Sequence, residues 1–196
     1  MNNFISFALV AIMLSVPLFS LSAFGADNVT SNKSQITEDQ FVTYDNSTQG
    51  IKIDYPKGWT VIEQGLAFLS PKENDSDTFR EGLRVTGGSV VNETIDKLAD
   101  SVLRFYNSTM KDFHLVESKD VIFHGNPAHV LIYTFSIPGN GTLKAMIPGN
   151  GTLKAMDFGT IESNIIHVFQ YLAQENKFDS YLPTIQRMID SFKAAK

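Results

Sequence analysis

Apolar and polar residues alternate with two different periods along this chain, and these periods predict two helices among many strands. Apolar positions recur at helical spacing over Thr94–Lys111 and again from about Lys177 to Lys193, which predicts an amphipathic helix in each segment. Period-two alternation and short apolar runs, bounded by Gly, Pro, Asn and Asp, predict strands elsewhere. The predicted strands are 50–55, 59–62, 66–70, 83–91, 114–117, 120–123, 128–137 and 163–174, with a further strand beginning near Thr152.

The order of these elements predicts a single α+β domain. One helix falls in the middle of the chain and the other at its end, so we expect an antiparallel β-sheet covered by helices rather than a closed barrel. The segment Ser163–Gln174 is the most hydrophobic of the predicted strands and is apolar on both faces in places. It is therefore predicted to lie centrally in a sheet that is covered on two sides.

A perfect repeat interrupts this pattern, because Ile137–Met146 and Ile147–Met156 both read IPGNGTLKAM. Its Pro-Gly-Asn-Gly core is turn chemistry, so the segment 137–156 is interpreted as a duplicated hairpin insert. The second copy adds ten residues, an even number, so the side chains of the flanking strands keep pointing to the same faces of the sheet. We expect the sheet to keep its pairing and the extra residues to protrude; a tolerated duplication is favoured over a partner-binding arm.

The N-terminal segment predicts export. Residues 4–21 are almost wholly apolar, and the small residues Ala23 and Gly25 are typical of a signal peptide cleavage site, which predicts a signal peptide over residues 1–25. A retained membrane anchor is the alternative, since the apolar run approaches the length that spans a bilayer. Residues 26–40 are polar and are predicted to form a flexible spacer, which leaves the folded domain at 41–196.

Composition narrows the possible functions. The chain has no cysteine, which excludes thiol catalysis, metal sites built from thiolates and lipid attachment at a lipobox. The fold has to be stabilised by packing, because it cannot form disulfide bonds. Its net charge is −5 and it has no basic run, so nucleic acid is excluded as a partner. We expect no transmembrane segment in the mature chain.

Asn-x-Ser/Thr triplets are far more frequent than chance, which would give roughly two. They predict a secreted or extracytoplasmic glycoprotein that is associated with the cell surface. The candidate glycosylation sites are Asn28, Asn32, Asn46, Asn74, Asn92, Asn107, Asn140 and Asn150.

The four histidines, His114, His124, His129 and His167, do not show the spacing of a helical metal motif. His129 and His167 lie on predicted strands that could be neighbours, so these two side chains could approach each other. Strand histidines are more often surface or core-edge residues than ligands, and we therefore expect no metal and no cofactor.

Other candidate chemistry is weaker. The acidic loop 73–77 offers oxygen ligands at alternate positions but lacks the glycine and the distant glutamate of an EF-hand, which favours a solvated loop. Trp59 follows a Pro-Lys-Gly turn and is interpreted as a core anchor rather than a ligand platform. No Gly-x-Ser-x-Gly elbow is present, and we predict no catalytic residue and no enzymatic activity.

Several segments resemble one protein family. The run FVTYDNSTQGIKIDYPKGW, which begins at Phe41, resembles the opening of the PsbP family. FREGLRV at 79–85, LVES at 115–118, GNPA at 125–128, YLA at 171–173 and IDSF at 189–192 agree with it, so the resemblance covers roughly Phe41 to Phe192. These motifs mark turns and core positions rather than a site.

The resemblance implies a PsbP-like α/β/α sandwich, the fold shared with the Ran-binding Mog-type proteins. Photosynthetic members are extrinsic lumenal subunits of photosystem II that help to retain calcium and chloride. The signal peptide, sequons and duplicated hairpin of this chain depart from them, so the photosystem role is not carried over. We expect an exported, non-enzymatic module that binds a protein or an envelope complex. The alternative is a small-ligand or ion-binding protein, or a hydrolytic enzyme, that uses a cleft between sheet and helix.

Overall fold

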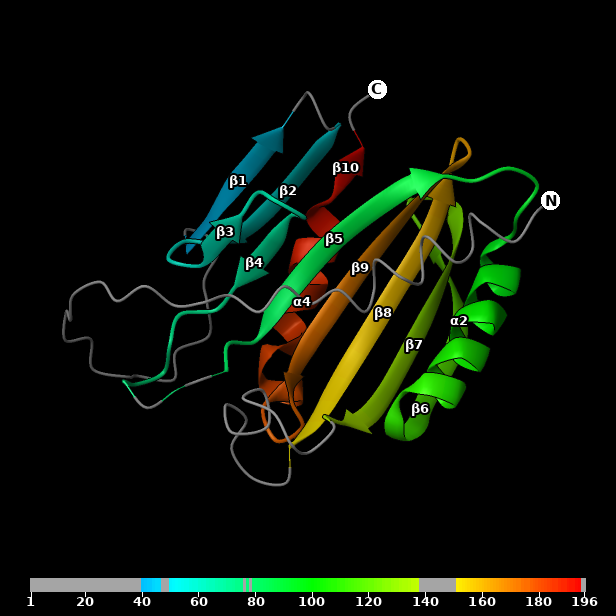
Figure 1. The fold of residues 1–196 in the computed structure, drawn as a ribbon. Helices are drawn as coiled ribbons and strands as arrows, with labels where there is room; N and C mark the ends of the chain where they lie inside the picture. The colour runs from blue at the N-terminus through cyan, green and yellow to red at the C-terminus, as the bar shows by residue number, and fades with distance from the viewer. Residues whose placement is uncertain (1–39, 47–49, 76, 78, 138–150, 195–196) are drawn as a thin grey trace. The chain divides into compact units, whose positions relative to one another are not determined.

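The computed structural model describes residues 40–46, 50–75, 77, 79–137 and 151–194, all within the compact unit 36–196. Seven strands form one antiparallel sheet in the order β3-β4-β5-β9-β8-β7-β6, and three others form a small antiparallel sheet in the order β1-β2-β10 (Figure 1). The strands are β1 Phe41–Asn46, β2 Ile51–Pro56, β3 Thr60–Ile62, β4 Ala67–Leu69, β5 Gly82–Ser89, β6 Lys111–Phe123, β7 Asn126–Ser136, β8 Thr152–Glu162, β9 Ile165–Gln174 and β10 Lys193–Ala194.

Two helices, α2 (Ile95–Thr109) and α4 (Phe178–Ser191), cover opposite faces of the large sheet (Figure 1). Adjacent residues of β8 show this division. Gly159 faces α2, because a Cβ atom built on it would lie 3.0 Å from Cδ1 of Ile95. Its neighbour Phe158 belongs instead to the hydrophobic core that includes Ile185 of α4. The predicted α+β class, with an antiparallel sheet covered by helices, is confirmed.

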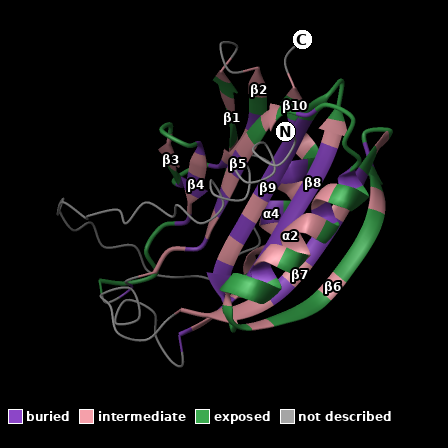
Figure 2. Ribbon diagram, turned by 45° about the vertical axis from the view of Figure 1, so that its right-hand side comes forward, coloured by how far each residue is buried: buried purple, intermediate pink, exposed green. Residues whose placement is uncertain are grey.

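Helix α2 forms where the sequence predicts it. Thr94 caps its first turn by accepting a 3.4 Å hydrogen bond from the Lys97 amide, and Asp96 places a negative charge near the positive end of the helix dipole. Ile95, Ala99 and Tyr106 form the buried stripe, while the outward face is exposed (Figure 2). The helix is thus positioned by its apolar face rather than by helix propensity alone.

Helix α4 ends earlier than the helix expected to about Lys193. Phe192 adopts an extended conformation, and Lys193–Ala194 pair with β2 as the short strand β10. The reason is packing: the Phe192 ring is buried edge-to-face against Phe169, with centroids 4.9 Å apart, which turns the chain away from the helix axis. The small sheet is also tied to α4 by a 2.8 Å hydrogen bond from the Asp54 amide to Oγ of Ser191.

The main core lies between the large sheet and α4, with β1, β2 and β10 adding further apolar contacts. Trp59 is buried in it and meets the ring of Tyr181 edge-on at 6.2 Å, which confirms its prediction as a core anchor. Strand β9 is fourth of the seven strands and pairs with β5 and β8, which confirms its predicted central place.

Strand β6 corrects the prediction of two short strands at 114–117 and 120–123, because it runs unbroken from Lys111 to Phe123. It forms the edge of the large sheet, and most of its residues are exposed (Figure 2). Its pairing with β7 is irregular between Lys111 and Glu117, where the register shifts twice. An edge strand with bulges need not alternate apolar and polar residues, so its sequence pattern is broken.

The duplicated segment leaves the sheet intact. Ser136 of β7 pairs with Thr152 of β8, and the Ile137 amide donates to the Gly151 carbonyl at 3.3 Å. The predicted preservation of strand pairing is therefore confirmed. The predicted protrusion of the extra residues within 138–150, the predicted signal peptide 1–25 and nearly all of the predicted spacer 26–40 lie outside the described residues. In the described part of the chain, neither helix has the length and apolarity that a membrane crossing requires.

Candidate functional site

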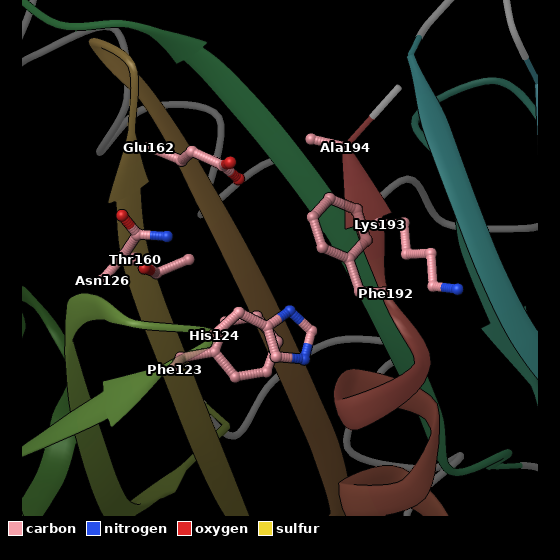
Figure 3. A pocket seen from close by; sticks show the side chains of 8 residues that line it. All are labelled: Phe123, His124, Asn126, Thr160, Glu162, Phe192, Lys193 and Ala194. Atoms are coloured by element: carbon pink, nitrogen blue, oxygen red, sulfur yellow. The ribbon is translucent and has the colours of Figure 1, made fainter. Parts of the chain in front are cut away.

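A cleft of about 270 Å³ opens where three segments meet: the β6–β7 turn, the end of β8 and the residues that follow α4 (Figure 3). Its volume lies just below the range typical of ligand pockets. The lining residues are Phe123, His124, Asn126, Thr160, Glu162, Phe192, Lys193 and Ala194.

The cleft combines aromatic rings with polar side chains. Phe123 and His124 stack with ring centroids 4.0 Å apart. The Thr160 hydroxyl donates a 3.0 Å hydrogen bond to the Pro127 carbonyl, so its hydrogen is not available to a ligand. The ammonium group of Lys193 points away from the carboxylate of Glu162 (Figure 3). The arrangement suits binding of a small polar group better than acid–base catalysis, which needs titratable groups aimed at one point.

A second polar group lies inside the protein, beneath α2. The carboxylate of Asp157 on β8 accepts hydrogen bonds from the hydroxyls of Tyr106 at 2.7 Å and Tyr133 at 3.3 Å, and from Nε2 of Gln170 at 3.3 Å. Burial raises the pKa of Asp157 to about 6, while the hydrogen bonds from Tyr106, Gln170 and Tyr133 act in the opposite direction. Asp157 and both tyrosines are buried, so this network joins α2 to the sheet and is closed to a substrate.

A third polar group, the hairpin cluster, consists of Asp96, Ser118, Asp120 and His129. Asp120 on β6 lies opposite His129 on β7, and Nδ1 of His129 is 2.6 Å from Oδ1 of Asp120. Nε2 of the same ring is 3.0 Å from Oγ of Ser118. Asp96, in the first turn of α2, brings a carboxylate to the same place: one ligand atom from each of Asp96, Asp120 and His129 lies within 4.8 Å of the others.

The order of contacts from Ser118 through His129 to Asp120 is that of a serine hydrolase relay. Ser118 and Asp120 are exposed on an edge strand, and neither lines the cleft of Figure 3. A hydrolase also needs a bound substrate and hydrogen-bond donors for the oxyanion. The hairpin cluster is therefore better suited to proton exchange or cation binding than to acyl transfer.

The expectation that His129 and His167 could approach each other is wrong. Strand β8 lies between their strands, with Gly159 opposite His129 and Thr160 opposite His167. Adjacent residues of one strand face opposite sides of a sheet, so the two histidines do as well. His167 packs against Phe192 with ring centroids 5.0 Å apart, and burial lowers the pKa of its imidazole.

The acidic loop 73–77 is solvated only in part. Glu73, Asn74 and Asp75 are exposed, as predicted, but Asp77 is buried. The carboxylate of Asp77 accepts hydrogen bonds from the amides of Glu73 and Phe79 at 3.0 and 3.3 Å. This side chain therefore organises the loop from within, which the charged sequence did not indicate.

The candidate glycosylation sites differ in accessibility. Asn74, Asn92 and Asn107 are exposed, whereas Asn46 is half-buried and donates a 3.1 Å hydrogen bond to the Tyr44 hydroxyl. Glycosylation itself stays a prediction. The sites at Asn28, Asn32, Asn140 and Asn150 lie outside the described residues.

Sequence reasoning missed the hairpin cluster. Its members on β6 and β7 are brought together by the turn at His124 and Gly125, whose φ angles of 50° and 84° are those of a two-residue hairpin loop. Such a loop places Asp120 opposite His129. The His124-Gly125 pair was the signal that would have predicted this contact, whereas nothing in the sequence indicated that Asp96 would join it.

The architecture belongs to the class of α+β sandwiches seen in PsbP and in the Ran-binding protein Mog1p, which confirms the predicted fold. Among solved structures, cyanobacterial PsbP from Synechocystis matches with a TM-score of 0.56 at 17% identity, covering 91% of this chain and 99% of that one. LpqN of Mycobacterium tuberculosis, involved in cell envelope biogenesis, matches with a TM-score of 0.52 at 11% identity, covering 80% and 91%. Mog1p of Saccharomyces cerevisiae matches with a TM-score of 0.51 at 10% identity, covering 80% and 96%.

No protein-family model matches the chain, and no curated protein matches it by sequence. The similarity to the solved structures therefore establishes the fold, and function has to be argued from the surface of this chain.

Proposed function

We propose that this chain is an exported, non-enzymatic module that binds a protein of the cell envelope through its edge strand β6. Edge strands carry backbone groups that can pair with an extended segment of another protein. Strand β6 has 13 residues, whereas β3 at the opposite edge of the same sheet has three. The long edge strand is the observation that carries the proposal.

The side chains of β6 support this role. Leu115, Val116 and Ile122 are exposed, Val116 to 51% and Ile122 to 74%. Apolar side chains at an exposed sheet edge lose contact with water when a partner strand covers them, which adds affinity to backbone pairing. From Glu117 to Phe123 the pairing of β6 with β7 is regular, so this half of the strand offers a regular outer edge. The expected partner is an extended segment with apolar side chains.

Two further observations agree with a binding module. The Asp157 carboxylate is sealed beneath α2, and the cleft in Figure 3 has a volume of about 270 Å³, just below the range typical of ligand pockets. LpqN is involved in cell envelope biogenesis and Mog1p binds Ran, so proteins of this fold include one that takes part in envelope biogenesis and one that binds another protein. The predicted signal peptide and sequons favour an extracytoplasmic location for this chain.

The test has two steps. The wild-type chain is first purified from the solubilised envelope of the native host to isolate its partner, and the affinity of each variant for that purified partner is then measured. Val116→Lys and Ile122→Lys together place charges on the β6 edge, and Val91→Lys is the matched control, because Val91 is 70% exposed outside β6. We expect the edge variant to lose at least tenfold in affinity and the control to bind normally. Equal binding by both variants would overturn the proposal for β6.

The cleft supports a second candidate function, binding of a small polar ligand, because His124, Asn126 and Glu162 gather around one opening. A library of small metabolites screened by thermal shift would test it. A hit that raises the melting temperature of the wild type, but not of Glu162→Gln or His124→Ala, would establish this function. Failure to isolate any stoichiometric protein partner would favour it over the first candidate.

A further inference from the structure

We propose that Asp96, Asp120 and His129 form a binding site for a divalent transition metal ion, of which zinc and manganese are the chemical type. The three residues come from different elements: the first turn of α2, strand β6 and strand β7. A bound ion would therefore fasten α2 to the β6–β7 hairpin. This inference does not depend on the proposed protein partner.

The spacing of the donor atoms is close to that of a metal site. Metal–ligand bonds of about 2.0–2.2 Å place neighbouring ligand atoms of a tetrahedral site roughly 3.4 Å apart. Nδ1 of His129 and Oδ1 of Asp120 are 2.6 Å apart, and the carboxylate of Asp96 completes a set whose members lie within 4.8 Å of one another. Asp120 is 73% exposed and Asp96 is also exposed, so rotation of these two side chains can close the remaining gap.

The local charge favours a cation. Two carboxylates approach a single imidazole here, and among the described residues no lysine or arginine forms an ion pair with Asp96 or Asp120. Lys119, the neighbour of Asp120 on β6, is paired with Glu117 at 2.7 Å. The positive end of the α2 dipole opposes a cation, but it amounts to about half a charge, whereas two carboxylates supply two full charges.

The orientation of His129 is already fixed. Its side chain is only 12% exposed, and Oγ of Ser118 lies 3.0 Å from Nε2. Imidazoles that bind metals generally use their second nitrogen to donate a hydrogen bond to a neighbouring group, which sets the tautomer. With Nε2–H donating to Ser118, the lone pair of Nδ1 points toward Asp120 and is available to an ion. Ser118 is thus a positioning residue for the metal ligand.

The donor set selects among metals. Calcium and magnesium take oxygen ligands almost exclusively, whereas one imidazole nitrogen with two carboxylates suits zinc or manganese. Binding of an ion at Nδ1 would replace the 2.6 Å contact between this nitrogen and Oδ1 of Asp120 with bonds from both groups to the metal.

For the experiment, a chelator first removes metal from the purified chain. Zinc or manganese is then titrated into the protein by calorimetry, and magnesium and calcium serve as comparison ions. We expect one equivalent of zinc or manganese, loss of binding in His129→Gln, and at least tenfold weaker binding in Asp96→Asn and Asp120→Asn. Ser118→Ala should weaken binding about tenfold. His114→Gln and His124→Gln, which alter exposed histidines outside the site, should bind like the wild type.

Circular dichroism of each metal-free variant verifies that the fold is retained. Absence of stoichiometric binding would overturn the proposal, and so would binding that survives His129→Gln. Normal binding in Asp96→Asn would also overturn it, because the site would then lack its helix ligand. The β6 edge variant with Val116→Lys and Ile122→Lys should still bind the metal, which separates this test from that of the protein partner.

Discussion

The hydroxyl of Tyr106 donates a 2.7 Å hydrogen bond to the carboxylate of Asp157, and this bond ties α2 to β8. Tyr106 is fully buried and also contacts the ring of Tyr133, with centroids 4.9 Å apart. Helix α2 therefore adds a polar contact in an aromatic setting to the apolar stripe through which it packs on the sheet. Because buried polar groups must be paired, this contact makes α2 sensitive to single substitutions.

Removal of the Tyr106 hydroxyl should destabilise the protein. Tyr106→Phe leaves the buried Asp157 carboxylate without its shortest hydrogen bond, and we expect the free energy of unfolding to fall by about 1–3 kcal/mol. Tyr133→Phe is the matched control: it removes a 3.3 Å bond to the same oxygen and should cost less. Urea unfolding at pH 7 measures both. A Tyr106→Phe protein as stable as the wild type would contradict this account.

Stability should fall as the pH rises through the titration range of Asp157. Burial raises its pKa from the usual 3.8 to about 6, so the folded state holds the proton more tightly than the unfolded state. The resulting stabilisation is fully present below pH 3.8 and is lost as the pH rises to about 6. The loss amounts to about 3 kcal/mol, because a pKa difference of one between the folded and unfolded states corresponds to about 1.36 kcal/mol. Urea unfolding at pH values from 4 to 7 measures the slope.

The control for this pH dependence is Asp157→Asn, which cannot titrate and should flatten the slope between pH 4 and 6. Burial also raises the pKa of Glu81, which acts with the same sign, so Glu81→Gln should flatten the slope further. A slope that is unchanged in the Asp157→Asn protein would show that the carboxylate is not the titrating group.

Deletion of one copy of the repeat should leave the fold unchanged. Removing residues 137–146 restores the same local sequence from the second copy, so Thr152–Met156 can pair as before. A connection ten residues shorter loses less entropy on closing, so we expect a gain of about 1 kcal/mol in the free energy of unfolding. Thermal melts compare the two chains; a cooperative transition lost on deletion would show that the second copy is structural.

Glycan occupancy should follow exposure. In a host that N-glycosylates, we expect glycans at the exposed Asn92 and Asn107 and low occupancy at the half-buried Asn46, whose amide is bonded to the Tyr44 hydroxyl. Intact mass of the wild type and of Asn92→Gln and Asn107→Gln gives the occupancy, with each variant losing one glycan mass. Full occupancy at Asn46 alone would contradict the order expected from exposure.

The sequence predicted the elements whose buried apolar residues recur at regular intervals along the chain. Both helices were predicted because their apolar residues recur every three or four positions, and β9 because both its faces are covered. Strand β6 was divided in two because Ser118 and Lys119 interrupt its apolar residues. At a sheet edge these side chains face solvent, and the strand is held by backbone pairing, which leaves no hydrophobic period.

The candidate sites were harder to predict because they depend on register. His129 was singled out with His167, but the order of the strands places β8 between them and gives His129 the partners Asp120 and Ser118 instead. No sequence pattern pointed to Asp157, because a single acidic residue within an apolar strand matches no functional motif. Its partner Tyr106 reaches it only through the docking of α2, which is a tertiary contact.

The place of β9 in the sheet has a consequence for how the chain matures. Strand β9 is the last long strand to leave the ribosome, yet it fills the centre of the sheet, where Val85 and Phe158 both pair with Phe169. Until it emerges, β5 and β8 each present an unpaired edge, and those edges are open to aggregation or to chaperones. The nascent chain therefore cannot close its sheet early. Such a delay would suit a polypeptide that has to be threaded across a membrane before it folds.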